Sequence, residues 1–345
     1  MTPRPRTVTL VRDYAAHGMD LRADETYVVE EPTLAHLLNL GVAGEIGRAE
    51  LPRGNGSRVL VSRTGGFGDI LFCTPLIRAL QAHGLSVSFS CVPHYRDALG
   101  GVTVDFVPYP LTPAQVADYD RVIWLEGVVE FATDPSRHAV DLIADAAGEN
   151  LTQGKHCSYR VAHQDAAWAA EKYPRTNCKR IGVQLAASAP SRTYPRELMM
   201  QVLSELLRKG YEVFLFGRPG EIQINTPHPR LVNTSAESPS FAQSCAILAT
   251  CDGVFTPDSA LCHVAGALDL PTVAIYGPFS WRSRTAYAQS IRALSGHLPC
   301  APCHWHGRGG PFPAGGPCAQ TGRCEALATV EPSRVVRELE KALGS

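Results

Sequence analysis

A glycine-rich turn directly after a short apolar segment is the first feature that could carry chemistry. The turn covers Thr64–Asp69, with the sequence TGGFGD, and follows Val59–Ser62. Glycines let a backbone approach a ligand closely, and the helix N-terminus expected after the turn attracts anions. The turn has neither the lysine of a P-loop nor the spacing of the dinucleotide-binding GxGxxG. Asp69 is therefore either a carboxylate that stabilises a helix N-terminus or a group that acts on a ligand.

A second polar turn follows the apolar segment Ile181–Gln184. It carries three hydroxyl side chains, among them Ser188, and the forked cation Arg192. Such groups suit a diphosphate at the carboxyl end of a strand. The alternative is an ordinary polar loop between a strand and a helix.

A third polar turn follows Gly253–Phe255 and leads into another predicted helix. Asp258 and Ser259 either cap that helix or meet a ligand beside its free backbone N–H groups. His263 lies four residues after Ser259, one helical turn further on. A lone histidine on a mostly apolar helix is more often a core residue than a catalyst.

These turns, in this order, resemble glycosyltransferase family 9, the ADP-heptose heptosyltransferases. The resemblance rests on four stretches: SRTGGFGDILFCTPLIRAL, GVQLAASAPSRTYPRE, YEVFLFGRPGE and GVFTPDSALCHVAGALDLPTVAIYGP. It covers roughly Arg58 to Pro278 and leaves residues 1–52 outside. It implies an α/β GT-B fold, in which two Rossmann-like domains face each other across a cleft. It also implies an inverting transfer without a catalytic metal.

The resemblance implies roles for individual residues as well. Asp69 would be the general base that takes the proton of the acceptor hydroxyl. Arg192, where the family commonly carries lysine, would hold the donor phosphates and is counted with Asp69 as catalytic. Glu221 would bind the ribose hydroxyls. The full set expected to bind the donor is Gly66, Gly68, Ser188, Glu221, Asp258, Ser259, Ala260 and His263.

Three residues at predicted strand ends of the first half are candidates for acceptor contact. They are His94, Tyr95 and Glu126. Glu126 is also the rival general base. Each of the three could equally be an ordinary loop residue.

Four cysteines near the C-terminus form a separate pattern. Cys300 and Cys303 make a CxxC pair, and Cys318 and Cys324 follow after gaps of fourteen and five residues. The Gly- and Pro-rich loop between them has few apolar residues to bury, so it needs a cross-link such as a bound metal ion or a disulfide to hold its structure. Four thiolates predict a structural zinc or iron site, with His304 and His306 as substitute ligands, while disulfides or free thiols are the alternatives. The segment also resembles the metal finger of the autotransporter heptosyltransferases, a protein-modifying branch of the family.

Apolar segments that alternate with helical patterns predict two parallel sheets covered on both faces. The expected strands of the first sheet are 59–62, 85–91, 104–107 and 121–125. Those of the second are 181–184, 211–216, 253–255 and 272–276. The helices expected are 32–40, one from the glycine turn through Leu80, 196–209, 241–249, 261–268 and 332–343.

The expected domains follow from these elements. Residues 1–52 form a small α+β accessory module, which is either a scaffold or an oligomerisation or targeting module. Residues 57–165 form the acceptor domain, joined by a hinge near 160–178 to a nucleotide-sugar domain, 175–330. That domain includes the cysteine finger, 298–326, and the chain closes with a helix, 331–345.

The composition describes an ordinary globular protein. Of 345 residues, 45% are hydrophobic and 19% charged, and the net charge of -1 gives no general attraction to nucleic acid or anionic membranes. No apolar run reaches the length of about 18–20 residues that spans a bilayer. The expectation is a cytoplasmic protein, with peripheral binding at the inner face of the membrane as an option.

The sequence as a whole predicts a glycosyltransferase that moves a sugar to a hydroxyl on protein or lipopolysaccharide. By resemblance, the donor is ADP-heptose. The expected partners are this donor, the acceptor protein or glycolipid, and further copies of the chain. The alternatives are a transferase with another nucleotide sugar and acceptor, such as a small metabolite or modified DNA, and a non-catalytic module that binds nucleotide sugars.

Overall fold

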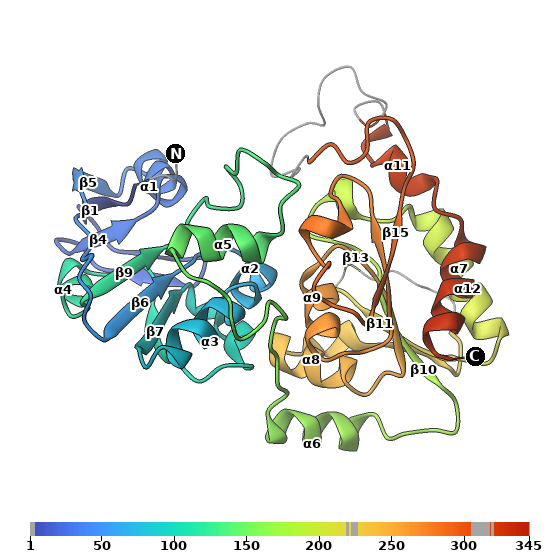
Figure 1. The fold of residues 1–345 in the computed structure, drawn as a ribbon. Coiled ribbons are helices and arrows are strands. Elements are labelled where there is room, and N and C mark those ends of the chain that lie inside the picture. The colour runs from blue at the N-terminus through green and yellow to red at the C-terminus, as the bar shows by residue number, and fades with distance from the viewer. Residues whose placement is uncertain (1–3, 219–220, 222–226, 305–317, 319–320, 345) are drawn as a thin grey trace. The chain divides into compact units, whose positions relative to one another are not determined.

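The computed structural model describes residues 4–344 with the exception of 219–220, 222–226, 305–317 and 319–320 (Figure 1). The chain divides into two compact units, Met1–Ser158 and Tyr159–Ser345. Each unit is described by itself. No helix among the described residues is both long enough and apolar enough to cross a membrane.

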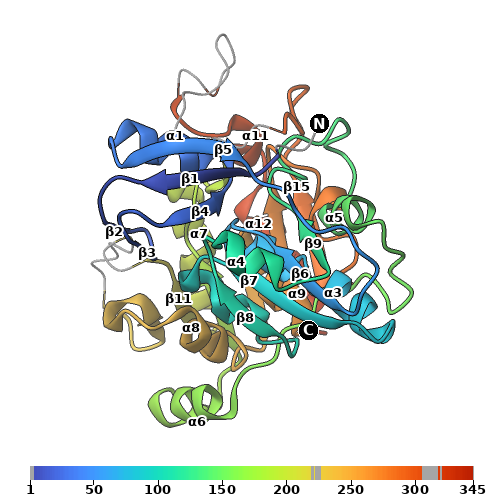
Figure 2. The same ribbon diagram turned by 90° about the vertical axis from the view of Figure 1, so that its left-hand side faces the viewer.

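The first unit begins with a small antiparallel sheet, in the order β4–β1–β5 (Figure 2). Alternate residues of β1, Val8 and Leu10, are buried against Leu34 and Leu37 of the following helix, as the period of two in a half-buried strand requires. The helix predicted over residues 32–40 is confirmed. The elements are β1 (Arg6–Leu10), β2 (Tyr14–Ala16), β3 (Met19–Leu21), β4 (Thr26–Val29), α1 (Glu31–Asn39) and β5 (Ala43–Arg48).

A parallel sheet in the order β8–β7–β6–β9 forms the rest of the first unit. Its four strands are the predicted ones. The single helix expected after the glycine turn is wrong, because it is interrupted at Phe72 and Cys73 just before Pro75, which has no N–H to continue a helix. The elements are β6 (Arg58–Ser62), α2 (Phe67–Leu71), α3 (Thr74–Ala82), β7 (Ser86–Cys91), η1 (Pro93–Leu99), β8 (Asp105–Pro108), α4 (Pro113–Ala117), β9 (Arg121–Trp124) and α5 (Ala139–Ala147).

The N-terminal sheet packs against this parallel sheet. Val28 of β4 lies in one apolar cluster with Leu60 of β6 and Val122 of β9. Its N–H donates to the carbonyl of Leu111 at 2.6 Å, and the N–H of Glu30 donates to the hydroxyl of Tyr109 at 3.0 Å. Residues 1–52 are therefore joined to the first unit by core packing and by backbone hydrogen bonds.

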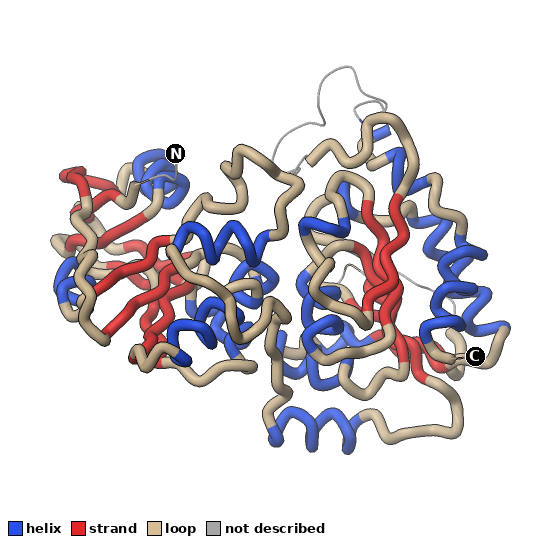
Figure 3. The backbone as a smooth tube through the Cα atoms, in the orientation of Figure 1, coloured by secondary structure: helices blue, strands red, loops and turns tan. Residues whose placement is uncertain are grey.

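The second unit has six parallel strands, in the order β12–β11–β10–β13–β14–β15. Helices α7 and α12 cover one face, and α8 and α9 cover the other (Figure 3). The elements are α6 (His163–Lys172), β10 (Arg180–Gln184), η2 (Pro190–Arg192), α7 (Arg196–Arg208), β11 (Glu212–Phe216), β12 (Leu231–Asn233), η3 (Thr234–Glu237), α8 (Phe241–Leu248), β13 (Gly253–Pro257), α9 (Ala260–Ala267), β14 (Thr272–Tyr276), η4 (Trp281–Ser283), β15 (Ile291–Ser295), α11 (Glu325–Ala328) and α12 (Pro332–Ala342).

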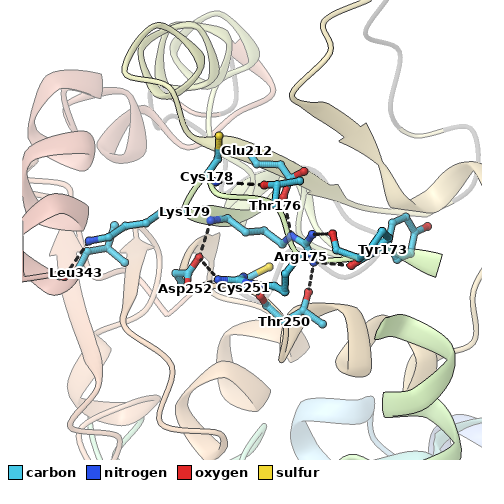
Figure 4. Close-up of polar contacts among 12 residues, drawn as sticks. Tyr173, Arg175, Thr176, Cys178, Lys179, Glu212, Thr250, Cys251, Asp252 and Leu343 are labelled. Carbon is cyan, nitrogen blue, oxygen red and sulfur yellow. Dashed lines mark hydrogen bonds and ion pairs between the residues drawn. The ribbon is translucent and has the colours of Figure 1, made fainter. Parts of the chain in front are cut away.

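A polar network ties the segment before β10 to the amino-terminal edge of this sheet (Figure 4). The buried guanidinium of Arg180 pairs with Glu212 at 2.9 Å and lies 4.1 Å from the ring centre of Phe214. Arg175 binds the carboxylate of Asp252 with distances of 2.8 and 3.0 Å. These contacts fix the start of three strands, so the opposite, carboxyl edge is the one left for a ligand.

Candidate functional site

The glycine turn of the first unit holds Asp69 at the start of α2. Gly66 is the N-cap residue, and its N–H donates to Oδ2 of Asp69 at 2.9 Å. A Cβ atom at Gly65 would lie 2.6 Å from the same oxygen, so a side chain at that position would displace the carboxylate. Asp69 therefore does cap the helix through one oxygen, as one interpretation predicted. Gly65, rather than Gly66, is the residue whose missing side chain makes room for it.

The second oxygen of Asp69 pairs with a buried arginine that the sequence analysis did not select. Arg63, at the end of β6, has a side chain only 2% exposed and donates to Oδ1 of Asp69 at 3.3 Å. The same guanidinium binds Glu130 at 2.7 and 3.1 Å. Burial alone lowers the pKa of Arg63, but the charges of Asp69, Glu130 and Glu126 outweigh it and raise this pKa well above its ordinary value. Arg63 is thus a permanent cation that orients the Asp69 carboxylate.

Glu126 lies beneath the turn and is 2% exposed. Burial and the charge of Glu30 raise its pKa well above the ordinary carboxyl value, although Arg63 opposes them. The hydroxyl of Thr64 lies 2.7 Å from Glu126 and 2.8 Å from Glu30. A hydroxyl donates only one proton, so one of these carboxyls must itself be the donor. Glu126 is also buried, whereas the side chain of Asp69 is 23% exposed, so Asp69 is the better candidate for a base that must reach an acceptor.

His94 and Tyr95 lie beside the same turn. Both belong to η1, and their rings are centred 5.4 and 5.0 Å from the ring of Phe67, the first residue of α2. Their side chains are exposed or half-buried. The structure therefore brings these two candidates for acceptor contact next to the helix that carries Asp69.

In the second unit, the turns after β10 and β13 meet. Arg192 donates to the hydroxyl of Ser188 at 2.6 Å and to the backbone carbonyl of Asp258 at 3.3 Å. Ser259 is the N-cap of α9, because its hydroxyl accepts from the N–H of Cys262. Its hydroxyl also donates to Gln184 at the end of β10. The expected donor-binding residues of these two turns thus form one cluster at the N-terminus of α9, where Ala260 begins the helix.

Asp258 has the most unusual environment in this cluster. Its side chain is 4% exposed and has His263 at 3.5 Å, Arg192 at 3.8 Å and Arg284 at 3.9 Å. Burial raises the pKa of Asp258, but the contact with His263 and the charges of the two arginines outweigh it and hold this pKa well below its ordinary value. His263 is therefore a buried neighbour of Asp258, and Arg284 is a cation that the sequence analysis missed.

Glu221 lies apart from this cluster in the described contacts. It is exposed, and its carboxylate accepts from the backbone N–H of Arg218 at 2.8 Å. The structure does not bring it into contact with Arg192 or Asp258.

The four C-terminal cysteines are free thiols. Burial and, to a smaller extent, the nearby thiols of Cys318 and Cys303 raise the pKa of Cys324 to about 11, so Cys303 and Cys318 both lie near Cys324. Among the described residues, no group of three or more His, Cys, Asp or Glu side chains has the geometry of a metal site. The donors fit zinc or iron in their chemistry, but the thiols do not form a preassembled coordination shell. His304 is described, whereas His306 lies outside the described residues.

Polar turns at the carboxyl ends of parallel strands are typical of α/β proteins that bind a nucleotide or its phosphates. The sequence model of glycosyltransferase family 9 (heptosyltransferase) matches residues 117–308. The chain belongs to this family of glycosyltransferases, as its motifs predicted.

One curated relative is lipopolysaccharide heptosyltransferase 2 of Salmonella typhimurium, with 28% identity over 169 residues. The alignment covers 46% of this chain and 44% of that protein, so the chain matches less than half the length of that relative. Lipopolysaccharide heptosyltransferase 1 of Pseudomonas aeruginosa is 38% identical over 64 residues, which are 19% of this chain and 18% of that protein.

Solved structures confirm the predicted GT-B fold. The ADP-heptose lipopolysaccharide heptosyltransferase II of Escherichia coli superimposes with a TM-score of 0.59 at 18% identity, over 83% of this chain and 98% of that one. The iron-containing dodecameric glycosyltransferase TibC of enterotoxigenic Escherichia coli does so with a TM-score of 0.61 at 12% identity, over 99% of this chain and 92% of that one.

Proposed function

We propose that the chain transfers a heptosyl group from ADP-heptose to an acceptor hydroxyl with inversion at the anomeric carbon. The observation that carries the proposal is that, in a member of glycosyltransferase family 9, two polar turns have side chains held in place by contacts within the protein. One turn orients the carboxylate of Asp69, and the other gathers cations at the N-terminus of α9.

In the proposed reaction, Asp69 takes the proton of the acceptor hydroxyl while the oxygen of that hydroxyl attacks the anomeric carbon. The bond from that carbon to the β-phosphate oxygen breaks, and the nucleoside diphosphate leaves with the bonding electrons. Arg192, hydrogen-bonded to Ser188, and the N–H groups at the start of α9 stabilise the charge of the leaving group. Every step uses groups of the chain itself and needs no metal ion.

The donor is tested with a panel of nucleotide sugars in thermal unfolding. A bound donor raises the melting temperature by mass action. We expect the largest rise with ADP-heptose and a smaller one with ADP. If no nucleoside diphosphate or nucleotide sugar shifts the unfolding, the proposal fails.

The proposal has two versions, which differ in the acceptor. In the first, the acceptor is a sugar of lipopolysaccharide, and in the second it is a protein side chain. The name of the Salmonella typhimurium relative supports the first. The cysteine segment, which resembles the metal finger of the autotransporter heptosyltransferases, supports the second. Incubation with ADP-heptose and either a truncated lipopolysaccharide or a candidate protein, followed by mass spectrometry, separates the two. A product of the opposite anomeric configuration to the donor supports inversion.

We further propose that Cys300, Cys303, Cys318 and Cys324 hold a structural iron or zinc ion. The proximity of three of these thiols supports this, as does the packing of the segment, where the N–H of His304 donates to the carbonyl of Pro278 at 2.7 Å. Metal analysis of the purified protein tests it. We expect about one ion per chain, and its loss in Cys324→Ser but not in Cys178→Ser, a cysteine in another part of the chain.

The proposed setting of the enzyme is the cytoplasm, with peripheral membrane binding in the lipopolysaccharide version. We also propose a homo-oligomer, because TibC is described as dodecameric. Light scattering of the full chain measures the assembly, and a monomer at all concentrations would remove this part of the proposal.

A further inference from the structure

We propose that Arg284 binds the diphosphate of the donor together with Arg192, as a second cation of the same site. The inference deepens the proposed function and rests on it. Arg284 lies just beyond η4, in the chain between β14 and β15, and so comes from a different turn than Arg192.

The two arginines approach one carboxylate oxygen. Nε of Arg284 lies 3.9 Å from Oδ2 of Asp258, and a terminal nitrogen of Arg192 lies 3.8 Å from the same atom. These distances are those of ion pairs and are too long for hydrogen bonds. The carboxylate of Asp258 thus holds two guanidinium groups near each other without accepting a hydrogen bond from either.

The side chain of Arg284 is fixed before any ligand arrives. It is 11% exposed, and its guanidinium lies 4.3 Å from the ring centre of Phe279. A guanidinium stacked on a ring keeps its N–H edge available for a partner in the plane.

The N–H donors of the Arg284 side chain are not used in hydrogen bonds among the described residues. Its Nε is buried with no hydrogen-bond partner, and the same is true of Nε of Arg192 and of both carboxylate oxygens of Asp258. Within the described part of the chain, the Arg284 side chain donates no hydrogen bond to the protein. A buried donor without a partner costs free energy, so this arrangement is built for a group that is supplied from outside.

The charge of the cluster defines that group. Two arginines and one carboxylate leave a net positive charge at the N-terminus of α9, which itself favours anions. Arginine forks match phosphate oxygens in geometry. A diphosphate offers anionic oxygens to both forks at once, whereas a nucleoside carries no phosphate oxygen.

The test compares adenosine, AMP and ADP by isothermal titration on the full chain and on variants. We expect Arg284→Ala to weaken ADP binding by roughly tenfold to a hundredfold and to leave adenosine binding unchanged. Arg284→Lys keeps the positive charge but loses the forked guanidinium, so its affinity for ADP should lie between those of the wild type and Arg284→Ala. The matched control is Arg282→Ala, because Arg282 is exposed and stacks on Trp281 at 4.7 Å, and we expect it to bind ADP like the wild type.

The outcomes separate the inference from the function it rests on. If the wild type binds no nucleoside diphosphate, the proposed function fails. If the wild type binds ADP and both Arg284 variants bind it equally well, the role of Arg284 is overturned while the function stands. An equal loss for adenosine and ADP would mean that Arg284 only supports the fold, and it too would overturn the inference. If Arg284→Ala does not fold, the comparison of ADP binding between Arg284→Lys and the wild type still tests the inference.

Discussion

At the scale of single residues, the structure distinguishes three carboxyl groups around one turn. Asp69 is half-buried and oriented by Arg63, Glu130 is bound to the same guanidinium, and Glu126 is buried with its pKa raised by that burial. They are chemically alike, but they differ in what surrounds them. These differences in environment are the reason for proposing Asp69, rather than Glu126, as the group that accepts the proton.

Asp69→Asn should strongly slow transfer while largely preserving donor binding, because all the expected donor-binding residues except Gly66 and Gly68 belong to the other unit. Removal of a general base typically costs about a hundredfold to ten-thousandfold in rate. Asp97→Asn, a change at an exposed position of η1, is the control and should keep normal turnover. Steady-state rates and ADP titration measure the two effects, and unchanged turnover in Asp69→Asn would remove this residue as the base.

Glu126 should make stability depend on pH. Since its pKa is raised on folding, its contribution to the free energy of unfolding is fully present below the ordinary carboxyl pKa and is lost as the pH rises through the folded-state pKa. Urea denaturation from mildly acidic to mildly alkaline pH should show this loss in the wild type and less of it in Glu126→Gln. The exposed Glu45→Gln should behave like the wild type, and a parallel decline in all three proteins would contradict the assignment.

At the scale of elements, apolar runs of four to six residues were sufficient to predict the buried parallel strands, such as β6, β11 and β14. The short or mostly exposed strands β2, β5 and β12 have no such run, because they are held by pairing rather than by burial. The sequence also did not reveal Arg63 and Arg284 as site residues. The partner Glu130 lies 67 residues from Arg63, and only the fold brings such residues together.

The buried pair of Arg180 and Glu212 holds the start of β10 and β11. Removing one partner of a buried pair leaves an uncompensated charge, which typically costs about 3–5 kcal/mol. We expect Glu212→Gln to lower the free energy of unfolding by an amount of this order in urea denaturation. Breaking the exposed pair of Arg208 and Glu205 by Arg208→Ala should have a much smaller effect, because solvent screens both charges. Equal effects of the two changes would show that the buried pair is not a special anchor.

At the scale of the whole molecule, the candidate groups are divided between the two compact units. The turn with Asp69 belongs to the first, and the cluster of Arg192, Asp258 and Arg284 belongs to the second. The proposed binding of the nucleotide and the proposed proton abstraction therefore rest on different units of the chain. This division makes it possible to disturb one without the other.

Hydrogen exchange of the full chain with and without ADP should show this division. Bound nucleotide should protect the backbone around residues 188–192 and the first turn of α9, because those N–H groups lie at the cluster of cations. The amides of β6, which lie outside the expected donor contacts of Gly66 and Gly68, should exchange at the same rate in both samples. Protection confined to the first unit would contradict the assignment of the donor to the second.

The carboxylate that Glu30 supplies to Thr64 has a practical consequence for anyone who trims the protein. The region that resembles other heptosyltransferases starts near Arg58, and a minimal version cut there looks attractive. Such a version would strip Leu60 and Val122 of the cover that Val28 gives them and would leave the catalytic turn with one neighbour fewer. Loss of activity in such a fragment would then reflect the loss of core packing and of the Glu30 contact, and would not test the chemistry of the intact enzyme.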